Sequence, residues 1–243
     1  MKAMTQPEVI QYLKSSLKDQ VQFTTQELIE LLSKANPEAN NKTHSWRINQ
    51  LKTDGLIHQI GRGLYSFDSK PEFIPVLSLK TKRLYNRVVE LVPDLELVVW
   101  ETPLLSDIMN KSIDKHFIFL HTNRNKLDLL HSELMNFSKP SFPNPSNEII
   151  EKYLLPLPEA IILLPLSSQT PIVELNEFKT NTIEGLLVTA CTLEPILKPI
   201  GIDIQQLFTL AFSKYNVNVS KLLRYAGRRD RKTEIIQILD TIS

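Results

Sequence analysis

The spacing of apolar residues near the start of the chain predicts three helices followed by a hairpin. Residues 24–27, Thr-Thr-Gln-Glu, form a capping-box sequence in front of the apolar positions within 28–32. A helix is therefore expected to start near Thr25 and to end at Asn36-Pro37, where proline interrupts the pattern. An earlier amphipathic helix is expected over residues 7–17.

The third of these helices follows a polar stretch and carries its apolar residues on one face. Thr43 or Ser45 is the expected N-cap, and Gly55 is suited to the left-handed residue that ends many helices. Ile48 and Leu51 fall on the same side of a helical wheel, so both are expected to point toward a core.

Directly after this helix, two β-prone runs predict a hairpin. Residues 56–60 and 64–67 flank Gly61-Arg62-Gly63, a three-residue loop that contains glycine. Arg62 at the tip is expected to point away from any core. Because helices followed by such a wing are typical of the winged helix-turn-helix, we expect residues 1–70 to form a DNA-binding domain of this kind.

Beyond residue 70 the chain alternates between strand-like and helix-like segments. The turn-forming residues 68–71, Asp-Ser-Lys-Pro, mark the expected boundary. Strands are expected at residues 95–100, 116–121, 160–166 and 172–178. Helices are expected at residues 80–91, 103–109, 126–137, 147–154 and 182–193, and residues 204–243 are expected to be purely helical. The predicted fold class is α/β (α+β): an N-terminal winged helix-turn-helix followed, over residues 71–243, by an α/β layered domain with a helical C-terminus.

Composition changes this picture mainly through charge. The 243 residues include 28 Lys or Arg and 27 Asp or Glu, and 42% are hydrophobic. A core of ordinary size is expected, but a net charge of +1 provides no general attraction to nucleic acid, so any such binding needs local patches of positive charge.

The N-terminus lacks an apolar signal segment and no apolar run is long enough to span a bilayer. A cytoplasmic protein without a membrane partner is therefore expected.

The polar face of the third helix is suited to reading DNA. Asparagine and glutamine match adenine edges, arginine matches guanine or phosphate, and hydroxyls bond phosphate oxygens. The predicted DNA-binding residues are Thr43, Ser45, Arg47, Asn49 and Gln50, together with Arg62 of the wing. A structural or protein-binding winged helix is the alternative, because residues 1–70 carry only nine Lys or Arg against seven Asp or Glu.

A second charged region lies near the C-terminus. Residues 220–232 hold six basic residues and one acidic residue. In a helix that starts after a Ser220 cap, Lys221, Arg224 and Arg228 are spaced at i, i+3 and i+7 and form one stripe. We expect this stripe to bind a phosphate-bearing or acidic partner. An ordinary solvated helix surface before a turn at Gly227 is the alternative.

Residues suited to catalysis or metal binding are sparse. The single cysteine, Cys191, excludes a disulfide framework within the chain and, without a basic neighbour, is expected to be a buried small residue. His116 and His121 are expected on opposite faces of one strand, as are Glu96 and Glu101, so neither pair should share a metal. With six glycines and no phosphate loop or nucleophile motif, no enzyme activity, catalytic residue, cofactor or metal site is expected. A nuclease-like site assembled from scattered carboxylates and a lysine stays open.

Two sets of residues resemble a known family. His44-Ser45-Trp46-Arg47-Ile48-Asn49-Gln50-Leu51, with residues 54–65, resembles the N-terminal winged helix of AbiEi-like antitoxins of type IV toxin-antitoxin systems. Segments 84–87, 99–102, 144–146 and 220–226 look like the accompanying C-terminal domain of a bacterial branch found beside a nucleotidyltransferase toxin.

The resemblance implies a function for each part of the chain. The winged helix is implied to bind inverted repeats in its own promoter, which makes double-stranded DNA a partner. The C-terminal domain is implied to counter the nucleotidyltransferase toxin without a stable complex. Implied DNA contacts are Ser45, Arg47, Asn49, Gln50 and Arg62. The implied antitoxic surface, which we call the basic face, is Lys221, Arg224, Arg228 and Arg229.

The sequence therefore predicts an antitoxin and transcriptional autoregulator, and two other classes stay open. A one-component winged-helix regulator would sense a small molecule in its α/β domain, and it would need an apolar pocket with a few convergent polar groups. A nucleic-acid-processing enzyme would need clustered carboxylates and a divalent metal.

We predict that Arg62→Ala weakens DNA affinity and flattens its salt dependence. Loss of one phosphate contact should reduce the slope of log affinity against log salt by about one. Fluorescence anisotropy with a promoter duplex over a range of salt concentrations measures this slope. An unchanged slope would show that Arg62 makes no phosphate contact.

Overall fold

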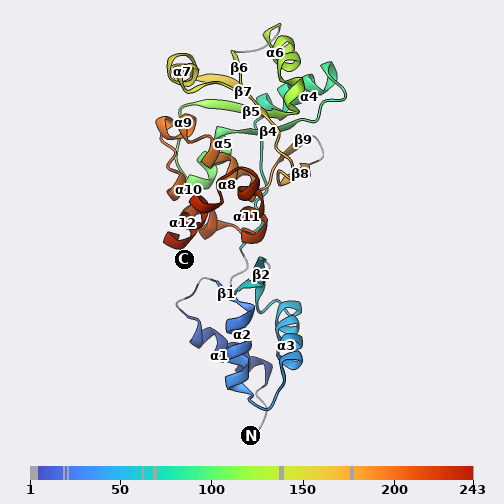
Figure 1. Ribbon diagram of the computed structural model, residues 1–243, viewed down its shortest axis with the longest axis vertical. Coiled ribbons are helices and arrows are strands. Elements are labelled where there is room, and N and C mark those ends of the chain that lie inside the picture. The colour runs from blue at the N-terminus through green and yellow to red at the C-terminus, as the bar shows by residue number, and fades with distance from the viewer. Residues whose placement is uncertain are drawn as a thin grey trace.

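The computed structural model describes residues 5–18, 20, 22–61, 63–67, 70–136, 140–175 and 178–242. An N-terminal and a C-terminal part lie at opposite ends of the long axis (Figure 1). Two hydrophobic clusters share no residue: one extends from Val9 to Tyr65, the other from Leu77 to Ile235. The division at residue 70 stays a prediction, and the two clusters lie on either side of it.

The N-terminal part has the element order of a winged helix. Its elements are α1 (Gln6–Ser16), β1 (Phe23–Thr24), α2 (Thr25–Ala35), α3 (Asn41–Thr53), β2 (His58–Gly61) and β3 (Leu64–Ser66). The strands form an antiparallel sheet in the order β1-β3-β2, in which Phe23 pairs with Tyr65 and His58 with Ser66. The predicted winged helix-turn-helix architecture is confirmed.

The helix caps explain where α2 and α3 begin. The Thr24 hydroxyl accepts from the Glu27 backbone N–H at 3.1 Å, and the Glu27 carboxylate accepts from the Thr24 N–H at 2.7 Å, so the predicted capping box is confirmed. The expected cap of α3 at Thr43 or Ser45 is wrong. Asn40 caps this helix by accepting from the Thr43 N–H at 2.9 Å, which starts α3 earlier than expected.

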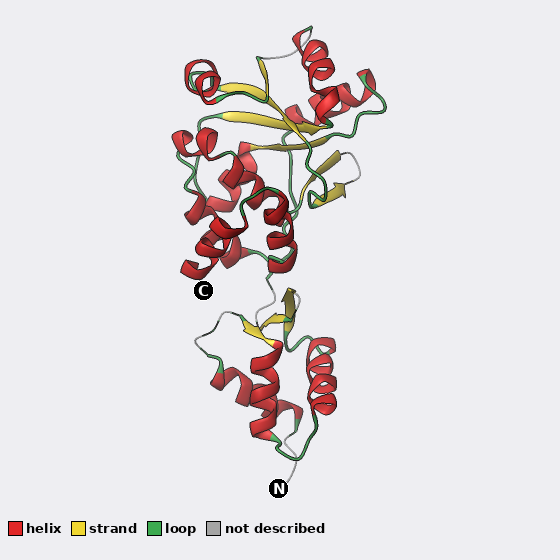
Figure 2. Ribbon diagram, in the orientation of Figure 1, coloured by secondary structure: helices red, strands yellow, loops and turns green. Residues whose placement is uncertain are grey.

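The C-terminal part is built from many short elements. They are α4 (Leu79–Leu91), β4 (Val98–Glu101), α5 (Thr102–Met109), β5 (His116–Thr122), the 3-10 turn η1 (Arg124–Lys126), α6 (Leu127–Met135), β6 (Ser141–Pro143), α7 (Asn147–Ile149), the π-helical turn η2 (Ile150–Leu154), β7 (Glu159–Pro165), β8 (Ile172–Leu175), β9 (Phe178–Asn181), α8 (Ile183–Thr192), α9 (Glu194–Leu197), the 3-10 turn η3 (Lys198–Ile200), α10 (Ile204–Lys214), α11 (Val219–Arg228) and α12 (Lys232–Ile242). Helices and strands are mixed throughout, which confirms the predicted α+β class (Figure 2).

A four-stranded sheet in the order β4-β5-β7-β6 forms the centre of this part. Strands β5, β7 and β6 are parallel, while β4 is antiparallel to β5. Residues 117–120 of β5 and 160–163 of β7 are all buried and apolar, as expected for parallel strands covered on both faces. Helices α8 to α12 gather between this sheet and the winged helix, and α11 lies against β2 (Figure 1).

Two segments differ from the sequence prediction. The single strand expected at residues 172–178 is a hairpin, in which β8 and β9 pair with Leu175 opposite Phe178. Neither glycine nor proline marks the reversal, so the apolar positions read as one continuous strand. Strand β6 was not predicted, because its three residues, Ser141, Phe142 and Pro143, are too short and too rich in proline to show an alternating pattern.

No helix in the described part of the chain is long and apolar enough to cross a membrane.

Candidate functional site

Helix α3 has a buried inner face and an exposed outer face. Ile48 and Leu51 are 4% and 0% exposed and belong to the N-terminal core. Ser45 and Asn49 are exposed, and Trp46 between them is 64% exposed. The predicted orientation of the helix is confirmed, and Trp46 lies on the outer surface.

The remaining predicted DNA-binding residues of α3 are more constrained. Thr43 is exposed in the first turn, where its backbone serves the Asn40 cap. Arg47 is half-buried at the flank of the face. Gln50 is also half-buried, and its amide donates to the Asp54 carboxylate at 3.1 Å. Gln50 would have to leave this contact before its amide could bond a base edge.

The wing is tied to the start of α2. The Thr25 backbone N–H donates to the Gly63 carbonyl at 2.8 Å, and the Thr25 hydroxyl donates to the same oxygen at 3.2 Å. Gly63 has φ +73°, a left-handed conformation that glycine adopts without strain. Arg62, the predicted wing contact, lies outside the described residues. Gly63 itself lies close to the N-terminal end of α2.

Helix α11 begins at Val219, directly after its N-cap Asn218. Asn218 accepts from the Lys221 N–H at 3.0 Å, so the expected Ser220 cap is wrong. Gly227 also lies within the helix instead of at a turn. The helix packs Leu222, Tyr225 and Ala226 into the C-terminal core. Its other side is where the basic residues emerge.

Lys221 of the basic face is engaged in an ion pair. Its ammonium lies 3.2 Å from the carboxylate of Glu184, a residue of α8 whose side chain is 6% exposed. The Asn218 N–H donates to the same carboxylate at 3.0 Å. A carboxylate this deeply buried needs a compensating charge, so Lys221 holds α11 on α8.

The three arginines of the basic face divide into two groups. Arg224 and Arg228 are exposed, although Arg228 Nε donates to the Gln169 side chain at 3.3 Å. Arg229 is half-buried and turns inward, where its guanidinium donates to the Ser167 hydroxyl and, at 3.1 Å, to the Thr192 hydroxyl. The structure therefore brings Arg228 and Arg229 to one loop, residues 167–170, and leaves Arg224 on the open surface.

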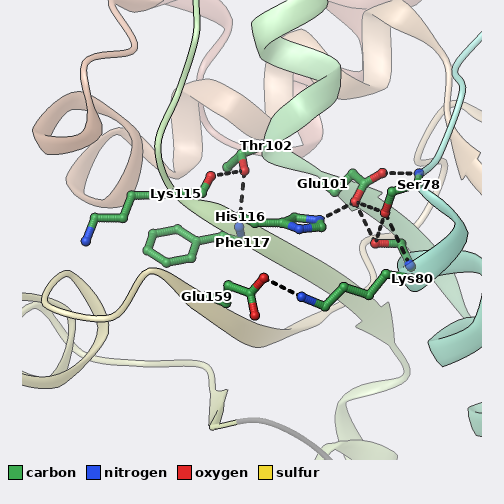
Figure 3. Close-up of polar contacts among 9 residues, drawn as sticks. Ser78, Lys80, Glu101, Thr102, Lys115, His116, Phe117 and Glu159 are labelled. Carbon is green, nitrogen blue, oxygen red and sulfur yellow. Dashed lines mark hydrogen bonds and ion pairs between the residues drawn. The ribbon is translucent and has the colours of Figure 1, made fainter.

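A buried carboxylate forms a second polar centre that the sequence did not indicate (Figure 3). The side chain of Glu101, at the end of β4, is fully buried. It accepts from the backbone N–H of Ser78, from the Ser78 hydroxyl at 2.9 Å, from the Thr81 hydroxyl at 2.6 Å and from His116 Nε2. We call these four residues the Glu101 network. It joins the start of α4, the end of β4 and the start of β5.

The Glu101 network holds its carboxylate in the charged form. Burial by itself would raise the pKa of Glu101, but the hydrogen bonds from Ser78, Thr81 and His116 outweigh burial and lower this pKa below its ordinary value. Four donors occupy the acceptor sites of one carboxylate, so little capacity is left for a metal or a substrate. The geometry is therefore that of a structural clamp.

Further contacts stabilise the same end of the strands. An ion pair between Lys80 and Glu159 joins α4 to β7 (Figure 3). The Thr102 hydroxyl donates to the Lys115 carbonyl and accepts from the Phe117 N–H at 3.1 Å. Among the described residues, no group of three or more His, Cys, Asp or Glu side chains is placed to hold a metal ion.

The two histidines of β5 have separate partners. His116 contacts Glu101, whereas His121 accepts from the Trp100 indole N–H at 3.0 Å. Burial, with the charge of Arg229, lowers the pKa of His121 to about 3, so its imidazole is neutral at ordinary pH.

Cys191 is buried, as predicted. Its burial raises the thiol pKa to about 12, so the reactive thiolate does not form at neutral pH.

A protein-family model, described as a family of unknown function (DUF6577), matches residues 43–243. The chain belongs to this family. The DUF6577 region begins inside α3 and includes the hairpin, the Glu101 network and the basic face. No curated protein matches the chain.

We predict that Glu101→Gln destabilises this DUF6577 protein and removes part of its acid sensitivity. Because the folded-state pKa of Glu101 is lowered, the carboxylate stabilises the fold above the unfolded-state pKa, and this contribution is lost as pH falls through the folded-state value. At neutral pH the substitution should lower the free energy of unfolding by about 1–3 kcal/mol, because the new NH₂ group would face hydrogen-bond donors and not acceptors. Urea unfolding measured from neutral to strongly acidic pH determines both effects.

The matched control is Glu148→Gln, which breaks a solvent-exposed ion pair with Lys152. This change should cost less than about 1 kcal/mol. Equal losses in the two variants, or an unchanged acid dependence in Glu101→Gln, would contradict the clamp.

Proposed function

We propose that this DUF6577 protein is a cytoplasmic antitoxin and transcriptional autoregulator of a type IV toxin-antitoxin system, without enzyme activity or cofactor. The winged helix would bind double-stranded promoter DNA, and the C-terminal part would counter a nucleotidyltransferase toxin. The observation that carries the DNA-binding half is the exposed polar face of α3 above buried Ile48 and Leu51, beside an antiparallel hairpin.

The local charge of α3 supports this proposal. Residues 41–53 contain Lys42, Arg47 and Lys52 and no acidic residue, on a chain whose net charge is only +1. A helix with three cations and no anion attracts phosphate locally even when the whole protein does not. In this proposal the cations orient α3 on the backbone, and Asn49 reads base edges in the major groove.

The antitoxin half rests on the resemblance to AbiEi-like proteins and on the arginines of α11. Arg224 and Arg228 are exposed on one helix and could meet an acidic or phosphate-bearing surface. Lys221 and Arg229 serve contacts within the protein. In the proposal, the exposed pair carries the antitoxic effect and Lys221 holds α11 on α8.

We predict that Asn49→Ala lowers affinity for the promoter duplex by roughly 5- to 100-fold, the range expected for one lost bidentate base contact. Affinity for a scrambled duplex should change little, because phosphate contacts remain. Fluorescence anisotropy with both duplexes measures the two affinities. The control is Gln26→Ala, an exposed position on α2. A similar loss on both duplexes would remove Asn49 from base recognition.

We predict that Arg224→Glu combined with Arg228→Glu abolishes neutralisation of the toxin while promoter binding persists. Lys221 is kept, because a glutamate there would lie against buried Glu184 and unfold the region. The measurement is growth on co-expression with the product of the adjacent reading frame. Lys198→Glu, an exposed lysine elsewhere in the C-terminal part, serves as the control. Retained growth rescue by the double variant would count against the exposed pair.

One observation favours a second candidate, a one-component regulator that senses a small molecule. A cleft of about 630 Å³ lies between the winged helix and the C-terminal helices. Its walls include Gln22 and Ile60 on one side and Phe212, Tyr215 and Ile242 on the other. The volume is in the range of ligand sites, and such sites often lie between domains. A harmless neighbouring gene product in the growth assay would favour this candidate.

A further inference from the structure

The inward-facing arginine of the basic face lacks a counter-ion. Arg229 is half-buried, and its two resolved donor contacts go to the neutral hydroxyls of Ser167 and Thr192. Its Nε–H is buried and has no hydrogen-bond partner within the described part of the chain. The adjacent acid, Asp230, makes no ion pair with it among those residues, and neither does any other carboxylate there.

Such a charge is unusual inside a protein. Removing a guanidinium from water is costly unless an opposite charge or a full set of acceptors replaces the water. The other half-buried cation of the same helix obeys this rule, because Lys221 is paired with Glu184. Unlike the charge of Lys221, the positive charge of Arg229 is not balanced by a carboxylate among the described residues. A bound anion would supply this partner.

The loop that receives Arg229 is placed where α/β sheets bind ligands. Ser167 follows Pro165, the last residue of β7, which is the central strand of the parallel set β5-β7-β6. In open sheets with parallel strands, ligands bind beyond the carboxyl ends of the strands. The loop of residues 167–170 thus occupies the position from which such sheets present ligands to solvent.

The loop also offers further donors. Arg228 reaches it through the 3.3 Å contact between its Nε and Gln169. Among the described residues, the backbone N–H groups of Ser168 and Gln169 donate to no protein acceptor, and both residues are exposed. Gln169 has φ +61°, a left-handed conformation that costs energy for a residue with a side chain. Both arginines therefore contact this one loop, which also carries a hydroxyl and two backbone N–H groups without a protein acceptor.

We propose that residues 167–170, together with Arg228 and Arg229, bind a phosphate group. Phosphate carries up to two negative charges and three acceptor oxygens, and arginine binds it through paired hydrogen bonds. The inference names a ligand for the two basic-face residues that contact the loop, Arg228 and Arg229, and rests on the proposed function. Phosphate binding can nevertheless be measured without toxin or promoter, so failure of either idea is recognised separately.

The test is calorimetric titration of the full-length protein with inorganic phosphate, against chloride at equal ionic strength. Arg228→Gln and Arg224→Gln form a matched pair, because both remove one exposed charge from α11 and Arg228 alone of the two contacts the loop. We expect Arg228→Gln and Arg229→Gln each to weaken phosphate affinity roughly ten-fold or more, and Arg224→Gln to change it less than about two-fold. Arg228→Gln keeps the test valid if Arg229→Gln does not fold.

The source of the phosphate is decided by two further titrations, with ATP and with duplex DNA. A free nucleotide is identified if ATP binds tightly, if Arg228→Gln and Arg229→Gln both weaken this binding, and if the slope of log DNA affinity against log salt stays unchanged. A salt slope that falls by about one in both variants identifies the nucleic-acid backbone. No phosphate binding above chloride, or equal weakening by Arg224→Gln, would overturn the site.

Discussion

The buried carboxylate of Glu101 is the interaction on which the C-terminal part depends. A charged group enclosed by protein is unfavourable unless donors replace its water, and here the donors come from the start of α4 and from β5. Because the donors belong to different elements, satisfying one charge sets the position of α4 against the edge of the sheet. Helices α8 to α12 lie between this sheet and the winged helix, and α11 contacts strand β2 (Figure 1).

In helix α11, contacts with neighbouring elements divide the basic residues into buried and exposed ones. Lys221 compensates buried Glu184, and Arg229 enters the interior beside Ser167 and Thr192. Only Arg224 and Arg228 remain exposed among the four residues of the basic face. Charge spacing along a helix therefore indicates which residues share a side, whereas the neighbouring elements determine which of them meet solvent.

Much of the fold could be predicted because its signals are local. The capping box at Thr24 indicates where α2 begins, and the apolar pair Ile48 and Leu51 indicates which face of α3 is buried. Both signals depend only on neighbours a few residues apart in the sequence. The prediction for the N-cap of α3 is wrong because several polar residues in a row can each act as an N-cap. In the structure this residue is Asn40. The reversal between β8 and β9 had no glycine or proline to mark it.

The candidate sites were harder to predict because they join distant residues. The sequence by itself determined the winged helix, the polar face of α3 and the alternation of strands and helices, all of which follow from short-range patterns of apolar residues. Only the tertiary structure decided that Glu101 meets Ser78, Thr81 and His116, and that Arg229 meets the loop after β7. The physical reason is that burial creates the demand for a partner, and burial is a property of the packed molecule.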